Sequence, residues 1–127
     1  MIDFKESAAL VKSLIDKWYQ NKAKSIFNKR LKTMLPKAVC VTGTPSFKLR
    51  TMKKQWGSCS AKGNLILNLH LFKAPKECID YVILRELCHI AKHNHSEHFW
   101  RLLTQVMPNW KEVKARLDGM AELYLNA

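Results

Sequence analysis

Residues 85–89 read RELCH, and these residue types are those of a zinc hydrolase with one change. A helix that carries H-E-x-x-H holds zinc between two histidines four residues apart and keeps a glutamate beside the metal. Glu86 and His89 stand where this pattern has its glutamate and its second histidine. Arg85 stands where the first histidine belongs, and a guanidinium has no lone pair to give to a metal. The chemistry indicated is metal-assisted hydrolysis at a site that lacks one ligand.

Other histidines surround this segment. His95 lies six residues beyond His89, so a third ligand from a loop or helix start after the metal helix is geometrically reasonable. His93 is four residues after His89, which opens an alternative site of His89, His93 and His95, although a polar role at the helix end is favoured for His93. His70 and His98 are expected on the surface or in hydrogen bonds, because unliganded histidines are common.

Three further side chains have alternative interpretations. Arg85 would fill the missing ligand position and hold the base if its guanidinium paired with Glu86. Cys88 precedes His89 by one residue, so it points about a quarter-turn away around the helix and is expected in the core. Cys59 is a thiol that no His/Asp arrangement in the sequence singles out as a nucleophile.

The composition is that of a globular domain. The 127 residues are 47% hydrophobic and 25% charged, enough for a core without disulfides or structural metal. We therefore expect one domain over residues 1–127. The start of the chain is too polar for a signal peptide, and no apolar run is long enough to span a bilayer, so a cytoplasmic location and no membrane partner are expected. The four cysteines form no C-x-x-C pair and are expected to stay reduced.

The positive charge is concentrated in one part of the chain. The formal net charge is +12, and residues 17–76 contain no Asp or Glu at all. Such a region attracts polyanions, whether nucleic acid, nucleotide phosphates or acidic polypeptide. The alternative is a solvated face that aids solubility, and no recognised nucleic-acid motif accompanies the charge.

The periodicity of apolar residues predicts helix, then strands, then helices. A helix is expected over about residues 5–35, where Val11, Leu14, Ile15 and Trp18 recur at helical spacing, with a break at Gln20–Asn21 and an end at Pro36. Strands are expected at 38–42 and 46–53, followed by a hairpin of 56–60 and 64–71. A helix begins near Pro75 and carries residues 85–89, and two more helices follow. The apolar stripe of the metal helix consists of Ile79, Val82, Ile83, Leu87 and Ile90.

Four segments resemble one family in the correct order. They are QWGSCS at 55–60, GNLILN at 63–68, IDYVILRELCHI at 79–90 and NHSEHFW at 94–100. They resemble the YgjP-like (DUF45) metal-dependent hydrolases, which are related to the WLM and SprT-like zincins. The resemblance implies a zincin-like α+β fold: an N-terminal helical segment, a small mostly antiparallel sheet, a metal-site helix and two more helices. Many relatives have a longer N-terminal part, so the chain is interpreted as a short form or a fragment.

The resemblance also implies roles for particular residues. Members usually carry H-E-L-x-H and a histidine six residues on, which implies Glu86 as general base and His89 and His95 as metal ligands. The implied cofactor is zinc or another divalent transition metal, held weakly because of Arg85. The segment Trp56, Gly57 and Ser58 is expected beside the metal helix, where a strand can pair with an extended peptide substrate. The alternative is a hairpin with a buried tryptophan.

The function predicted is a metallopeptidase-like zinc hydrolase with activity weakened or lost through Arg85. One alternative is a metal-dependent nucleotide phosphohydrolase of the pyrophosphatase type, although no Gly-rich phosphate loop is present. Another is a non-catalytic module on a hydrolase scaffold that binds nucleic acid or another polyanion through residues 17–76. The expected partners are accordingly a peptide or nucleotide substrate, or a polyanion.

Overall fold

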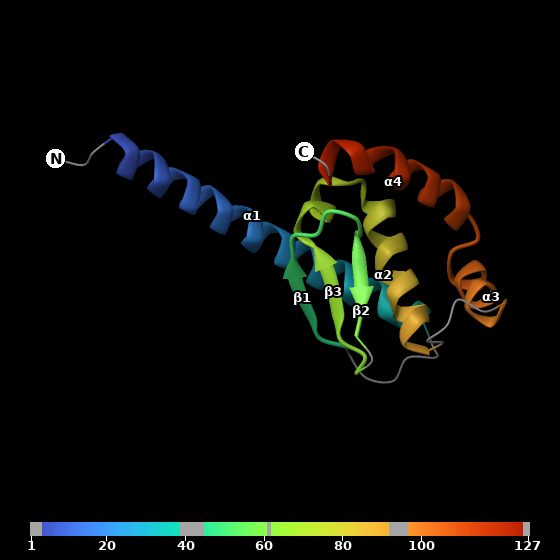
Figure 1. Ribbon diagram of the computed structural model, residues 1–127. Helices are drawn as coiled ribbons and strands as arrows, with labels where there is room; N and C mark the ends of the chain where they lie inside the picture. The colour runs from blue at the N-terminus through green and yellow to red at the C-terminus, as the bar shows by residue number, and fades with distance from the viewer. Residues whose placement is uncertain (1–3, 39–44, 61, 92–96, 126–127) are drawn as a thin grey trace.

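The structure is a computed structural model that describes residues 4–38, 45–60, 62–91 and 97–125 (Figure 1). The elements follow in the order α1 Phe4–Met34, a 3-10 turn Leu35–Lys37, β1 Phe47–Arg50, β2 Gly57–Cys59, β3 Leu65–Asn68, a second 3-10 turn Leu69–Lys73, α2 Lys76–Ala91, α3 Glu97–Val106 and α4 Trp110–Tyr124. This is the α+β arrangement that the sequence predicts. The strand expected at 38–42 falls largely outside the described residues.

The described sheet has the strand order β1-β3-β2. β2 and β3 are antiparallel, as expected for the hairpin, and Gly63 makes its turn with a φ of 85° that favours glycine. β1 instead pairs in parallel with β3, so the sheet is mixed and not mostly antiparallel. The reason is topological: residues 51–56 lead the chain past β3, so β2 lies on the far side and β3 returns between the two earlier strands.

Helix α1 is continuous, and the break expected at Gln20–Asn21 does not occur. Neither residue is a proline or a glycine, and Asn costs a helix well under about 1 kcal/mol, which tertiary packing overrides. The C-terminal half of α1 buries Ala23, Phe27, Leu31 and Met34 in the core. The N-terminal half extends away from the rest of the protein (Figure 1). Its apolar side chains, Leu10, Val11, Leu14, Ile15 and Trp18, are 47–58% exposed.

Helix α2 lies between the sheet and the helices α3 and α4 (Figure 1). Its predicted apolar stripe is confirmed, because Ile79, Val82, Ile83 and Leu87 are buried and Ile90 packs against the core. Cys88 is also fully buried, as predicted. Since α1, α3, α4 and β2 all contact this one helix, it fixes the position of the residues that it carries. No helix of the described residues is both long and apolar enough to cross a membrane.

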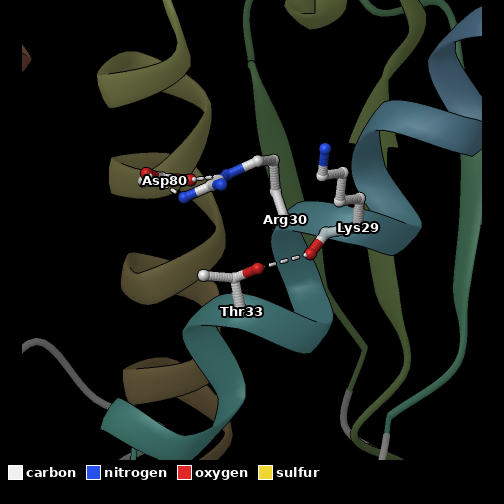
Figure 2. Close-up of polar contacts among 4 residues, drawn as sticks. All are labelled: Lys29, Arg30, Thr33 and Asp80. Atoms are coloured by element: carbon white, nitrogen blue, oxygen red, sulfur yellow. Dashed lines mark hydrogen bonds and ion pairs between the residues drawn. The ribbon is translucent and has the colours of Figure 1, made fainter.

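A buried ion pair joins α1 to α2 (Figure 2). Arg30 donates from Nε to Asp80 Oδ1 and from a terminal nitrogen to Asp80 Oδ2, both at 2.7 Å. Both residues are buried. The two parallel hydrogen bonds give each carboxylate oxygen of Asp80 a donor. A buried carboxylate needs such donors because it has lost its hydrogen bonds to water. The pair therefore fixes the register of α1 against the helix that carries the candidate site.

The pair gives a prediction about stability. Arg30→Met leaves the Asp80 carboxylate buried without its partner and should lower the free energy of unfolding by about 3–5 kcal/mol. The double variant Arg30→Met/Asp80→Leu removes both charges and should recover most of that loss. Urea unfolding of the two variants and of Lys29→Met, an exposed neighbour, provides the measurement. If Arg30→Met were as stable as Lys29→Met, the Arg30–Asp80 pair would not stabilise the packing of α1 against α2.

Candidate active site

The side chains of the RELCH segment meet the strand β2 in one cleft of about 320 Å³. Arg85, Glu86 and His89 line it from α2. Glu86 is only 6% exposed, and its Oε2 lies 3.8 Å from Nδ1 of the half-buried His89. The helix places these two side chains together because residues three apart share one face. The glutamate and the second histidine of the motif are therefore adjacent, as the spacing predicts.

The surroundings of Glu86 act on its pKa in opposite directions. Burial raises the pKa of its carboxyl, while the nearby positive charge of Arg85 and the interactions with His89 lower it, and the net direction is upward. Among the described residues, Glu86 forms an ion pair with His89 and none with Arg85. The structure therefore does not support the interpretation in which Arg85 pairs with Glu86. A desolvated carboxylate of raised pKa beside a histidine is suited to accept a proton at neutral pH.

Tyr81 is a cleft residue that the sequence reasoning missed. It lies one helical turn before Arg85 and lines the same cleft. Its hydroxyl is buried and has no hydrogen-bond partner among the described residues. Burial is the largest cause that raises the pKa of this hydroxyl, so it remains a protonated donor. The four-residue spacing from Arg85 was the available signal, because it places both side chains on one helix face.

Strand β2 forms the opposite wall and lies very close to α2. A Cβ on Gly57 would lie 2.8 Å from Val82 Cγ1 and 3.4 Å from Glu86 Cγ. The predicted close backbone approach of Gly57 is therefore confirmed. Trp56 and Ser58 line the cleft as well, so the structure brings the whole expected segment beside the glutamate.

Asn68 holds the chain that leads into β2. Its side-chain nitrogen donates to the carbonyls of Met52 and Gln55, each at 2.8 Å, and its main-chain N–H donates to the carbonyl of Trp56 at 2.9 Å. Its side-chain oxygen accepts from the N–H of His70 at 3.1 Å. Asn68 is fully buried, so these bonds replace those that water would make. The last residue of the GNLILN segment thus has a structural role in positioning the cleft wall.

The remaining candidates lie elsewhere or play other parts. Cys59 lines the cleft, but burial and the neighbouring Glu86 raise the pKa of its thiol, which disfavours the reactive thiolate. His70 lies in the second 3-10 turn, 3.4 Å from Lys73 Nζ, and burial lowers its pKa. His98 is exposed on α3. His70 and His98 are therefore not cleft residues, as the sequence indicates.

The described residues supply only part of a metal site. No group of three His, Cys, Asp or Glu side chains suited to a metal ion occurs among them. His89 offers a nitrogen ligand and Glu86 a carboxylate, whereas Arg85 offers neither. His93 and His95 lie outside the described residues. With Glu86 as the base, His89 is the metal ligand that the described cleft offers, and any further protein ligand would come from outside the described residues.

Comparisons with known proteins identify a family and two similar folds. The family model of the YgjP-like metallopeptidase domain matches residues 2–120. The fold is similar to the metallopeptidase zymogen abylysin of Pyrococcus abyssi, with a TM-score of 0.68 and 24% identity over 76% of this chain and 94% of that chain. It is also similar to the zymogen jannalysin of Methanocaldococcus jannaschii, with a TM-score of 0.57 and 24% identity over the same shares. A comparison with curated proteins found no match. At this identity the two structures support the fold alone, and the zincin-like α+β prediction is confirmed.

The contact at Gly57 gives a second prediction. Gly57→Ala places a methyl group against Val82 and should lower the free energy of unfolding by about 1–3 kcal/mol. The double variant Gly57→Ala/Val82→Ala also removes the atom that the new methyl group would meet. Its loss in the free energy of unfolding should be smaller than the sum of the losses in Gly57→Ala and Val82→Ala. Thermal melts of all three variants measure this coupling, with Gly119→Ala as the control because nothing lies near a Cβ there. Strict additivity would contradict the close contact.

Glu86 gives a prediction about pH. Because its pKa in the folded state lies above the ordinary value of 4.5, the native state binds this proton more tightly than the unfolded chain does. The associated stability is present below pH 4.5 and is lost as pH rises through the folded-state pKa. Glu86→Gln should therefore be more stable than the unmodified protein at pH 7, and the difference should shrink towards pH 4. Urea unfolding of both proteins at several pH values, with chelator present, measures this difference in stability. A difference that grows towards pH 4 would contradict the raised pKa of Glu86.

Proposed function

The chain belongs to the YgjP-like metallopeptidase family, and from that premise we propose that it hydrolyses peptides with the help of a weakly held metal ion. The observation that carries the proposal is the buried Glu86 beside His89 in a cleft walled by an edge strand. A base, a potential metal ligand and a surface for an extended chain are the parts that such a reaction requires.

The edge of β2 supports a peptide as the substrate. Trp56 accepts from Asn68, and Ser60 donates to Asn64, so these alternate residues direct their main-chain groups towards β3. Gly57 and Cys59 lie between them and direct theirs outward from the sheet. An extended peptide in the cleft would gain main-chain hydrogen bonds there, next to Glu86.

The residues that would hold the metal are His89 and His95. When bound, zinc would lower the pKa of a coordinated water and polarise the substrate carbonyl. Glu86 accepts a proton from the attacking water, and its raised pKa suits that role. Tyr81 offers its buried hydroxyl as a donor to the oxygen of the carbonyl under attack, which would supply the partner that the hydroxyl lacks among the described residues.

Arg85 explains why the metal should be weakly held. Catalytic zinc ordinarily has three protein ligands, and Arg85 occupies the helix position from which one of them would come. It also lines the cleft with a fixed positive charge that opposes a dication. We therefore expect zinc, or another divalent transition metal, to be lost on dialysis against a chelator. Activity should accordingly require metal in excess.

The experiment that tests the proposal is hydrolysis of a mixed peptide library with zinc in excess. Glu86→Gln should lower kcat by roughly 10²–10⁴-fold, and Tyr81→Phe by up to about 10²–10³-fold. Glu112→Gln changes an exposed glutamate on α4 and should leave the rate unchanged. Mass spectrometry of the products measures the rates. Cleavage that survives chelator, or that Glu86→Gln does not affect, would exclude the proposed mechanism.

A further inference from the structure

A second concave surface lies apart from the cleft, between α1 and β1. This α1–β1 groove has a volume of about 800 Å³. Its helical wall includes Gln20, Lys24, Asn28 and Lys32, which recur at steps of four and so form one face of α1. Its other wall is β1, which forms one edge of the described sheet (Figure 1). The two walls run alongside one another, and an extended chain fits between such walls.

The outer side of β1 carries main-chain groups that the described sheet does not use. Ser46 accepts a hydrogen bond from the N–H of Leu65, and Phe47 is the register partner of Leu65. In a parallel ladder, the residues on either side of a register partner make the hydrogen bonds, so Ser46 and Lys48 bond towards β3. Phe47 and Leu49 therefore direct their N–H and C=O groups outward. An added strand would meet these two residues at the ordinary spacing of two residues along a strand.

The side chains of the groove divide into an apolar part and a basic part. Phe47 and Leu49 are half-buried, whereas Lys48 and Arg50 are exposed on the opposite face of β1. Leu31 and Leu69 extend the apolar part. The basic side chains that line the groove are Lys24, Lys32, Lys48 and Arg50, and none of the described residues that line it is acidic. A strand of alternating apolar and acidic residues complements both parts.

We propose that the α1–β1 groove binds an acidic, extended peptide segment that pairs with the outer edge of β1. Apolar side chains of the segment would face Leu31 and Leu69, and its acidic side chains would face Lys48 and Arg50. This site lies on the opposite edge of the described sheet from β2, so it does not depend on the metal or on Glu86. It would recruit a partner protein through an acidic, extended segment of that protein.

A peptide fits the groove better than a nucleic acid does. Single-stranded nucleic acids gain much of their affinity from bases stacked on exposed aromatic rings. Phe47 is the aromatic side chain that lines the groove, and it already packs edge-on against Phe27, with ring centroids 6.3 Å apart at 77°. The outward main-chain groups of β1, in contrast, match the repeat of a peptide strand and not that of a phosphate backbone.

The test uses a fluorescein-labelled, end-capped octapeptide of alternating Val and Glu, with chelator present to suppress hydrolysis. Fluorescence anisotropy should show binding that weakens as salt rises, and the matching Val/Lys peptide should not bind. N-methylation of alternate residues separates pairing from simple charge attraction. One peptide carries N-methyl groups on its Val residues and the other carries them on its Glu residues. Only one of the two peptides should lose binding, because only alternate main-chain N–H groups of a paired strand point towards β1. Equal tolerance of both methylated peptides would overturn the proposal.

Two double variants of equal charge change locate the site. Lys24→Glu/Arg50→Glu reverses charges that line the groove and should weaken Val/Glu binding at least about tenfold. Lys12→Glu/Lys29→Glu reverses exposed charges on α1 outside the groove lining and should change it less than about threefold. Equal effects of the two would overturn the proposal. An oligo-dT of eight nucleotides that binds more tightly than the peptide and responds to the groove variants would also overturn it, in favour of nucleic acid.

Discussion

The close approach of β2 to α2 at Gly57 is the constraint on which the candidate site depends. A Cβ at this position would lie 2.8 Å from Val82 Cγ1 and 3.4 Å from Glu86 Cγ, so any side chain larger than hydrogen would force a shift. The approach brings β2, an edge strand of the described sheet, beside the buried carboxylate. Asn68 maintains it from one side by holding residues 52–56, and the Arg30–Asp80 pair maintains it from the other by fixing α2 against α1.

Features that depend on local sequence were predictable. The spacing of Glu86 and His89 on one helix and the buried face of α2 follow from residue types and periodicity. The place of Gly57 beside α2 was implied by the family resemblance instead. Features that depend on distant partners were not. The parallel pairing of β1 requires knowledge of where β3 returns, and the periodicity of residues 10–18 predicts a helix without stating whether its apolar face is covered. The spacing of Tyr81 from Arg85 places it on the same helix face, but only the structure shows that its buried hydroxyl has no hydrogen-bond partner among the described residues.

The electrostatics of the site also explain why position 85 matters. Burial raises the pKa of Glu86, and the positive charge of Arg85 lowers it. A divalent metal would lower the pKa of Glu86 further. A neutral side chain at position 85 would remove the lowering that Arg85 causes. The arginine thus partly compensates the buried carboxylate, at the position where the family resemblance implies a metal ligand. Under the proposed function, Arg85 would favour the stability of the fold and oppose the binding of metal.

The most direct test of this account is the effect of zinc on the melting temperature of Arg85→His and of the unmodified protein. A ligand that binds only the folded state stabilises it by mass action, so zinc at 100 times its Kd should raise the Tm of Arg85→His by roughly 10 °C relative to chelator. The unmodified protein should shift much less at the same zinc concentration, and so should Arg50→His, which adds a histidine away from the cleft. Equal zinc shifts in the unmodified protein and in Arg85→His would show that position 85 is not a metal position.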